Sequence, residues 1–281
     1  MSNGTGVLYI VATPIGNLGD ISPRAVEVLR GVDVILAEDT RHSARLLNHL
    51  GVKTRTAALH DHNERGIVTQ IVSRLGAGES MALISDAGTP LISDPGYHLV
   101  RAARVVGVKV VPIPGASALL VALSVSGLPT ARFVFEGFLP PASGARRRAF
   151  ERLRHEERTL VFYEAPHRIE DCLSDAVEVF GAQREAVLAR ELTKTYETIL
   201  AGTLADLLDT LRSDKNQCKG EFVFLIKGST GEDSKWITAH ATLVHLLEEL
   251  PVKRAVAVAA KITGEKKNRL YQAALLLRQS E

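Results

Sequence analysis

The sequence predicts an α/β protein with two successive α/β domains followed by a small helical domain. The chain has 281 residues, which exceeds the size of most single domains. Short apolar runs alternate with helical patterns in two series, and a Gly-Leu-Pro turn signal at residues 127–129 separates them. The last part of the chain shows helical patterns only. We therefore expect domains at residues 1–125 and 126–228 and a helical tail at residues 237–281.

The first domain is expected to hold a mostly parallel sheet covered by helices. Apolar strands are predicted at residues 6–12, 32–37, 56–59, 80–84 and 109–113. One helix starts at Pro23 after the capping residue Ser22, an arrangement that helix starts favour. Further helices are predicted at residues 64–76 and 97–107, and a leucine-rich face predicts another that ends at Gly51. Such a sheet places the loops that follow its strands at one edge.

A second α/β series follows the turn signal. Strands are predicted at residues 132–138, 158–163, 184–191, 196–202 and 221–226, with helices after residue 143, at 168–180 and at 205–212. Residues 227–235, KGSTGEDSK, are polar and contain glycine, which indicates a linker. The short helices predicted beyond it are typical of either a helix-turn-helix unit or a small packing domain, and both alternatives stay open.

Composition and charge favour a protein of the reducing cytoplasm. Cys172 and Cys218 lie far apart, which predicts neither a disulfide framework nor a metal site. The first residues lack the features of a signal peptide, and no apolar run reaches membrane-spanning length. The formal net charge is only +2, but positive charge gathers at residues 146–158 and 261–269. Each cluster is either a surface that contacts RNA or a solvated helix face.

Five polar loops rich in glycine, proline and acidic residues follow the predicted strands of the first domain. They are TPIGNLGD (13–20), AEDTRHS (37–43), HDHNE (60–64), SDAGTPLISDPG (85–96) and PGASA (114–118). One such loop is usually a plain turn, whereas five at one sheet edge predict a ligand site. Neither GxxxxGK[ST] nor a GxGxxG after the first strand occurs, so a P-loop is excluded and a Rossmann dinucleotide site is not expected.

These loops, together with VPIPGAS, FVFEGFLP, YEAPHRI and ARELTKTYE, resemble the tetrapyrrole (corrin/porphyrin) methylase superfamily. Within it they are similar to the methyltransferases that modify a cytidine 2′-hydroxyl of small-subunit ribosomal RNA. The resemblance covers about residues 6–228, and the helical tail also fits the RNA enzymes. It implies a homodimer that binds S-adenosylmethionine between its two α/β domains and methylates 16S ribosomal RNA within the small subunit.

The resemblance also implies which residues contact the methyl donor. In the wider superfamily a Gly-Asp-Pro turn touches the donor, and here Thr89 replaces the aspartate of that turn. Asp86, two residues earlier, is the candidate to supply the missing carboxylate. The implied donor contacts are Ile15, Gly16, Asp86, Gly88, Thr89, Ile92, Ser117, Ala118, Glu164, Leu192 and Glu221.

A ribose hydroxyl attacks a methyl group well only when another group accepts its proton. A sulfonium donor is already activated, so the reaction needs no Lewis acid and no metal site is expected. The predicted catalytic residues are Lys194, Glu191, His60, His62 and Glu64, with Lys194 either a base of lowered pKa or a charged clamp for phosphate. The predicted RNA contacts are Arg41, Arg146, Arg147, Arg148, Arg168, Lys266, Lys267 and Arg269.

Two other functions are compatible with this fold. One is a methylase that acts on a precorrin or a similar macrocycle, and the other is a non-enzymatic RNA-binding protein on the same scaffold. The basic helix and the basic tail favour an RNA substrate over a macrocycle. The intact loops at the sheet edge favour an enzyme over a binding protein.

Overall fold

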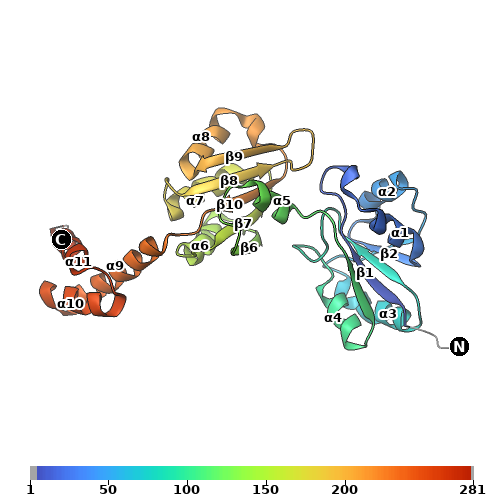
Figure 1. Cartoon of the computed structure of the whole chain (residues 1–281), viewed down its shortest axis with the longest axis horizontal. Helices are drawn as coiled ribbons and strands as arrows, with labels where there is room; N and C mark the ends of the chain where they lie inside the picture. The colour runs from blue at the N-terminus through green and yellow to red at the C-terminus, as the bar shows by residue number, and fades with distance from the viewer. Residues whose placement is uncertain (1–4, 280–281) are drawn as a thin grey trace.

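The computed structural model describes residues 5–279, without the side chains of residues 231–235, 237, 278 and 279. The chain forms three parts that follow one another in space as they do in sequence (Figure 1). The first sheet and its helices lie at the end that holds the N-terminus, the second sheet lies in the middle, and three helices lie at the other end. The expected fold class, two α/β units and a helical C-terminal part, is confirmed.

The first sheet is fully parallel, with strand order β3-β2-β4-β1-β5. Its strands are β1 (Val7–Val11), β2 (Val34–Ala37), β3 (Thr56–Ala58), β4 (Met81–Ile84) and β5 (Lys109–Ile113). The helices are α1 (Pro23–Gly31), α2 (Thr40–His49), α3 (Glu64–Gly76) and α4 (Tyr97–Val105), with a short 3-10 turn, η1, at Leu18–Asp20. Two apolar clusters, one on each face, bury strands β2 and β4 completely, as a doubly covered parallel sheet requires.

Local sequence signals explain the starts of the first helices. The Ser22 hydroxyl accepts a hydrogen bond from the backbone N–H of Ala25, and Pro23 is the first helical residue of α1, as predicted. Asp39 caps α2 in the same way, because its carboxylate accepts from the backbone N–H groups of Arg41 and His42. This cap starts α2 directly after β2 and so holds the loop between them short.

The second sheet is mixed, with strand order β6-β7-β10-β8-β9. Its strands are β6 (Phe133–Phe138), β7 (Thr159–Glu164), β8 (Glu185–Arg190), β9 (Thr198–Thr203) and β10 (Phe222–Ile226), and only the pair β6 and β7 is parallel. Helices α6 (Ser143–Leu153), α7 (Ile169–Phe180) and α8 (Leu204–Ser213) supply its main apolar core, and η2 (Lys215–Cys218) follows α8.

Helix α5 (Ala118–Val125) connects the two sheets and packs against the second one. Leu119, Ala122 and Leu123 share an apolar cluster with side chains of β7, β8 and β10. These helix residues fall within the range 1–125 expected for the first domain, although the surface they bury belongs to the second sheet. The expected domain boundaries themselves stay predictions.

The tail consists of α9 (Gly231–Glu249), α10 (Val252–Thr263) and α11 (Lys267–Gln279). It has an apolar core of its own, in which Leu243, Val256 and Leu270 are buried. The linker predicted at residues 227–235 is shorter than expected, because α9 already begins at Gly231. Among the described residues, no helix is both long enough and apolar enough to cross a membrane.

Candidate functional site

The loops at the carboxyl edge of the first sheet meet the second sheet around a cavity of about 530 Å³, which we call the central cavity. Its walls come from the loops after β1, β2 and β4, from the start of α5, and from β7, β8 and β10. Ten of the eleven implied donor contacts line it, namely Ile15, Asp86, Gly88, Thr89, Ile92, Ser117, Ala118, Glu164, Leu192 and Glu221. Gly16 does not line the cavity; it packs against Leu192 and Lys194 instead.

The turn at Gly88 is tied to its neighbours through the backbone. Gly88 has φ +82°, and its N–H and C=O groups exchange hydrogen bonds with Thr13 at 3.1 and 2.8 Å. A Cβ atom at Gly88 would lie 3.3 Å from the side chain of Ile15. The Thr89 hydroxyl donates a hydrogen bond of 3.0 Å to the carbonyl oxygen of Ala116, so it joins the turn to the start of α5. Thr89 therefore holds the loop after β4 to the start of α5 through its hydroxyl.

Three carboxylates gather on the first-sheet side of the central cavity, where the sequence singled out only Asp86. Glu38 follows β2, and Asp94 ends the loop that contains Asp86. Burial, reinforced by Glu38, raises the pKa of Asp94 to about 7. Burial and then Asp86 raise the pKa of Glu38. The signal that would have found both residues is their position in loops already recognised as polar, with Glu38 directly after β2.

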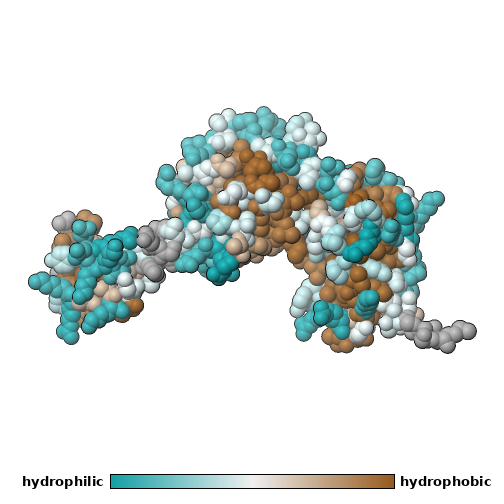
Figure 2. Space-filling view, in the orientation of Figure 1, coloured by the Kyte–Doolittle hydropathy of each residue, from teal (hydrophilic) through white to brown (hydrophobic). Residues whose placement is uncertain are grey.

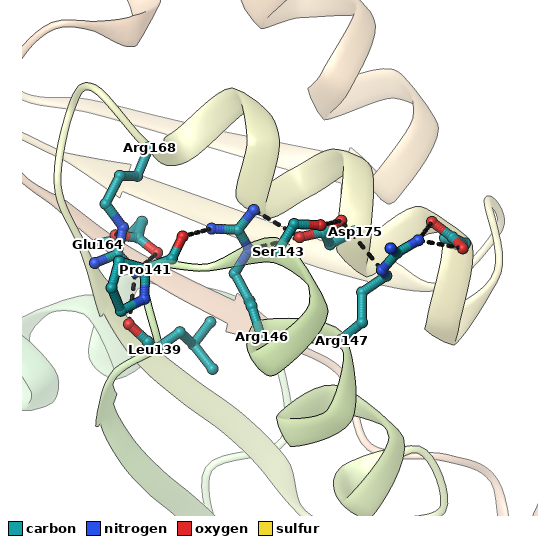
Figure 3. Close-up of polar contacts among 9 residues, drawn as sticks. Leu139, Pro141, Ser143, Arg146, Arg147, Glu164, Arg168 and Asp175 are labelled. Carbon is teal, nitrogen blue, oxygen red and sulfur yellow. Dashed lines mark hydrogen bonds and ion pairs between the residues drawn. The ribbon is translucent and has the colours of Figure 1, made fainter.

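The opposite wall is anchored by Glu164 at the end of β7. Its side chain is fully buried, and Arg168 holds it with an Nε to Oε1 distance of 3.0 Å (Figure 3). The same guanidinium donates from Nη2 to the carbonyl oxygen of Leu139 at 2.6 Å. Next to Glu164, the Tyr163 hydroxyl accepts from the backbone N–H of Leu119 at 3.3 Å, and burial raises the pKa of this phenol.

The loop between β8 and β9 closes a third side of the cavity through a three-residue ion cluster. Lys194 Nζ lies 2.9 Å from a carboxylate oxygen of Glu191 and 3.0 Å from one of Glu221. Glu191 and Thr193 adopt positive φ, which is uncommon for residues other than glycine. The ion cluster holds Glu191, and the backbone N–H of Thr193 donates to the Glu197 carboxylate at 2.7 Å. Burial alone would lower the pKa of Lys194, but its hydrogen bonds to the two glutamates outweigh burial and raise the pKa. Lys194 is therefore a cation at neutral pH, which removes the interpretation as a base of lowered pKa.

Comparison with known families identifies the fold that carries this cavity. Residues 7–208 match the model of the Tetrapyrrole (Corrin/Porphyrin) Methylases. The chain belongs to this methylase family. Residues 235–278 match a second model, the RsmI C-terminal HTH domain, which corresponds to helices α9–α11. The match favours the helix-turn-helix alternative for the tail.

Full-length relatives of this methylase carry one shared name. The chain is 57% identical to the ribosomal RNA small subunit methyltransferase I of Pseudomonas aeruginosa, over 96% of this chain and 97% of the relative. It is 52% identical to the protein of the same name from Escherichia coli O157:H7, over 97% and 96% of the two chains. Among solved structures, diphthine synthase aligns with a TM-score of 0.61 at 17% identity, covering 80% of this chain and 91% of that one. The uroporphyrin-III-C-methyltransferase of Thermus thermophilus aligns with a TM-score of 0.54 at 19% identity, over 79% and 94% of the two chains, so both share the fold.

Of the predicted catalytic residues in the HDHNE loop of this methylase, Glu64 has a structural role. It is 4% exposed, and its carboxylate accepts a 3.0 Å hydrogen bond from the backbone N–H of Leu99 in the first turn of α4. A carboxylate held in this way anchors a helix start and does not reach the central cavity. His60 and His62 lie with ring centroids 6.1 Å apart, and neither lines the cavity. Glu64 thus has a structural role in holding α4, and the expected catalytic roles of Glu64 and of the histidines stay predictions.

Two of the predicted RNA-contacting arginines are used inside the protein. Arg146 is 2% exposed and pairs with Asp175, with an Nη2 to Oδ2 distance of 2.6 Å, while its Nη1 donates to the carbonyl oxygen of Pro141 (Figure 3). Arg168 is committed to Glu164 and Leu139 as described above. The Arg146 guanidinium is buried and paired, so the RNA-binding prediction is wrong for Arg146. Arg168 is half-buried, and its predicted RNA contact stays a prediction.

The remaining predicted RNA contacts lie at the surface. Arg147 pairs with the exposed Glu178 at 2.7 Å, whereas Arg41 and Arg148 are exposed. In the tail, Lys266 and Lys267 are exposed, while the Arg269 guanidinium lies 4.0 Å from the ring centroid of Trp236 and 3.5 Å from Glu265. Arg269 therefore joins α11 to α9 by a cation–π contact. Arg41, Arg148, Lys266, Lys267 and Arg269 are thus exposed, and Arg147 is half-buried.

Proposed function

We propose that this methylase transfers the methyl group of S-adenosylmethionine to the 2′-hydroxyl of a cytidine in 16S ribosomal RNA. The observation that carries the proposal is the central cavity, into which the fold brings ten residues implied as donor contacts from both halves of the chain. The shared name of the full-length relatives supports small-subunit ribosomal RNA as the acceptor. The alternative substrate, a macrocycle, gains no support from the cavity because nothing in its lining is specific for a tetrapyrrole.

The lining of the central cavity fits such a donor. Its volume falls in the usual range for ligand sites, roughly 300–1,000 Å³. The carboxylates Glu38, Asp86 and Asp94 suit a positively charged sulfonium. The start of α5 offers backbone N–H groups to a carboxylate, since Ser117 makes no side-chain capping bond there. When bound, the donor supplies an electrophilic methyl carbon.

The ion cluster of Lys194, Glu191 and Glu221 orients this wall and does not abstract a proton. Lys194 is charged, and its two carboxylate partners hold the loop of residues 191–194 against the Gly16 turn. With 28% of its side chain exposed, Lys194 still faces solvent at the edge of the site. We assign it to holding the loop and to attracting the phosphate backbone of the RNA.

RNA binding is assigned to the exposed basic residues and to the tail. Arg41, Arg148, Lys266 and Lys267 present their charges to solvent, and the tail is folded as an independent unit around its own core. Figure 1 places this unit beyond the second sheet, where it extends the length of RNA or subunit surface that the enzyme spans. Phosphate contacts of this kind position RNA without reading its sequence.

The enzyme is proposed to act as a cytoplasmic homodimer. Figure 2 shows apolar surface gathered around α5 and the adjoining face of the second sheet. Exposed residues of this region include Leu120, Val125, Phe133 and Phe138. Apolar patches of this kind mark protein interfaces. Light scattering on the purified protein tests the dimer, and Leu120→Asp is expected to shift it to a monomer.

The decisive experiment is transfer of a labelled methyl group to small ribosomal subunits purified from cells that lack this enzyme. We expect label on one cytidine, resistance of that linkage to alkaline hydrolysis, and no transfer to subunits that already carry the modification. Free precorrin-type macrocycles serve as the competing acceptor. Transfer to the macrocycle and none to the subunit would replace the proposed function with the alternative.

A further inference from the structure

We propose that a second hollow beside the central cavity binds the nucleoside that receives the methyl group, and that Asp94, between the two, accepts its hydroxyl proton. The proposal rests on the proposed function and adds the acceptor subsite to it. It also replaces the HDHNE and RELTKTYE segments as the source of the base. None of the implied donor contacts and none of the predicted RNA contacts lines this hollow.

The hollow has a volume of about 420 Å³ and lies between the loop after β3 and the start of α4. Its chemically distinctive lining is Asp61, Glu64, Arg65, Asp94, Tyr97 and His98. Asp94 is the residue that lines both this hollow and the central cavity. A group bound in the hollow therefore reaches the donor side of the site past the Asp94 carboxylate.

An aromatic and a cationic side chain form the outer wall of the hollow. The Tyr97 side chain is 58% exposed and makes an edge-to-face contact with His98, at 5.2 Å between ring centroids. The Arg65 Nε lies 3.3 Å from His98 Nε2 on the same wall. Exposed aromatic rings stack unpaired bases, and a guanidinium stacks or binds phosphate, so this wall fits one nucleotide taken out of its helix.

The inner wall is rigid and acidic. Glu64 holds the first turn of α4 through its bond to Leu99, and that turn carries Tyr97 and His98. The carboxylates of Asp61 and Asp94 accept hydrogen bonds, which fits a ribose hydroxyl and the exocyclic amine of cytosine. The acidic wall suits the sugar and base of a nucleotide better than its negatively charged phosphate. We expect the phosphate to lie against the outer wall, where Arg65 can bind it.

Asp94 has neighbours from its own loop and from other elements, and the carboxylates among them make it a better proton acceptor. These groups are the carboxylates of Glu38, Asp61 and Asp86, the hydroxyl of Ser85 and the phenol of Tyr163. Burial and the neighbouring carboxylates raise its pKa, and only the bond from Ser85 lowers it. A positive sulfonium nearby lowers the pKa of Asp94 and keeps it ionised before the reaction. When the sulfonium becomes a neutral thioether, the Asp94 carboxylate becomes more basic, at the moment when the ribose hydroxyl loses its proton.

The step balances without any further reactant. The hydroxyl oxygen forms a bond to the methyl carbon while the bond from that carbon to sulfur breaks. The electron pair of the broken bond stays on sulfur, which becomes a neutral thioether. The hydroxyl proton moves to Asp94 and is then released to solvent through the open side of the hollow.

The first test changes the shared carboxylate. Asp94→Asn is expected to lower turnover on small subunits at saturating donor about 100-fold, the size of effect a general base supplies. Calorimetric donor affinity should also fall, because Asp94 lines the central cavity and attracts the sulfonium. The ionisation on the acid side of the pH–rate profile should disappear. Turnover within about threefold of the wild type would overturn the assignment, as would a large loss of donor affinity with normal turnover at saturating donor.

The second test changes the aromatic wall while leaving the central cavity intact. Tyr97→Ala is expected to raise the KM for the subunit about tenfold, as loss of one stacked base predicts, while donor affinity stays unchanged. Tyr97→Phe should restore the wild-type KM. Val105→Ala, at the exposed end of the same helix, is the matched control and should behave as the wild type.

If the wild type methylates subunits and Tyr97→Ala leaves the KM for the subunit unchanged, the proposed acceptor subsite is wrong while the proposed function stands. The proposed function fails separately, when the wild type itself transfers no label to the subunit. The two failures are therefore distinguished by the wild-type reaction, which is measured in the same assay.

Discussion

The loops around the central cavity and the basic helix α6 were both candidate functional regions in the sequence, but their side chains have different environments in the structure. Nearly all of the loop residues implied as donor contacts meet around one cavity. In α6, three consecutive arginines have three different environments: Arg146 is buried against Asp175, Arg147 pairs with Glu178 at the surface, and Arg148 is exposed. A string of arginines therefore does not form one surface.

The difference has a geometric cause. Loops after parallel strands converge because the sheet itself brings the strand ends together, whatever the loops contain. Consecutive residues of a helix point about 100° apart, so a charged run always spreads around the helix and one member can face inward. Here α7 supplies Asp175 at the place where Arg146 points inward (Figure 3).

Gly88→Val should give the largest effect on the cavity side of this comparison. A β-branched residue at φ +82° is strained, and its side chain would contact Ile15, so we expect donor binding to fall below detection by calorimetry. Gly107→Val is the matched control, since Gly107 has φ +79° with no atom within 4 Å of its added Cβ. Unchanged donor affinity in Gly88→Val would remove this turn from the site.

Arg146→Ala should give the largest effect on the side of the basic helix, and the effect should be on stability. Removing the arginine leaves Asp175 buried with a lost partner, which costs about 3–5 kcal/mol of unfolding free energy. Denaturant unfolding measures the loss. The double variant Arg146→Met with Asp175→Leu should recover most of it, because no charge is left buried. If Arg146→Ala is as stable as the wild type and binds RNA more weakly, Arg146 contacts RNA at the surface after all.

Lys194→Ala should give an intermediate effect on the reaction. Loss of the cation frees Glu191 and Glu221, and the loop with positive φ at Glu191 and Thr193 relaxes. We expect the KM for the subunit to rise about tenfold, as for a lost charge-assisted contact, with donor affinity nearly unchanged. The pH–rate profile should keep its shape, because Lys194 stays charged through neutral pH. A missing ionisation in that profile would instead make Lys194 the base.

Arg148→Ala should give the smallest effect and the clearest contrast with Arg146. The residue is exposed, so stability should stay within about 0.5 kcal/mol of the wild type. RNA affinity should fall severalfold, and the slope of log affinity against log salt should decrease by about one if a phosphate contact is lost. Wild-type affinity with an unchanged slope would show Arg148 to be only solvated.

Sequence reasoning reached the fold and most of the residues that line the central cavity, but it missed Asp94 and Glu38 and did not predict the structural role of Glu64. The missed carboxylates lie in recognised loops, and nothing local separates them from Asp86, which lines the same cavity. The role of Glu64 depends on the start of α4, 35 residues away in the chain. Polar residues in loops thus indicate where a ligand site lies, whereas the hydrogen-bond or ion-pair partner of each residue decides the role of that residue.

The sequence by itself determined the alternation of strands and helices, the loops at the sheet edge and the family resemblance. These features depend on local hydrophobic period, capping residues and motif spacing, all of which are written along the chain. Only the tertiary structure decided that α5 packs on the second sheet, that Arg146 is buried against Asp175, and that Lys194 is held as a cation. Those outcomes depend on desolvation and on charges brought from distant segments, which only the packed chain places within a few ångströms of one another.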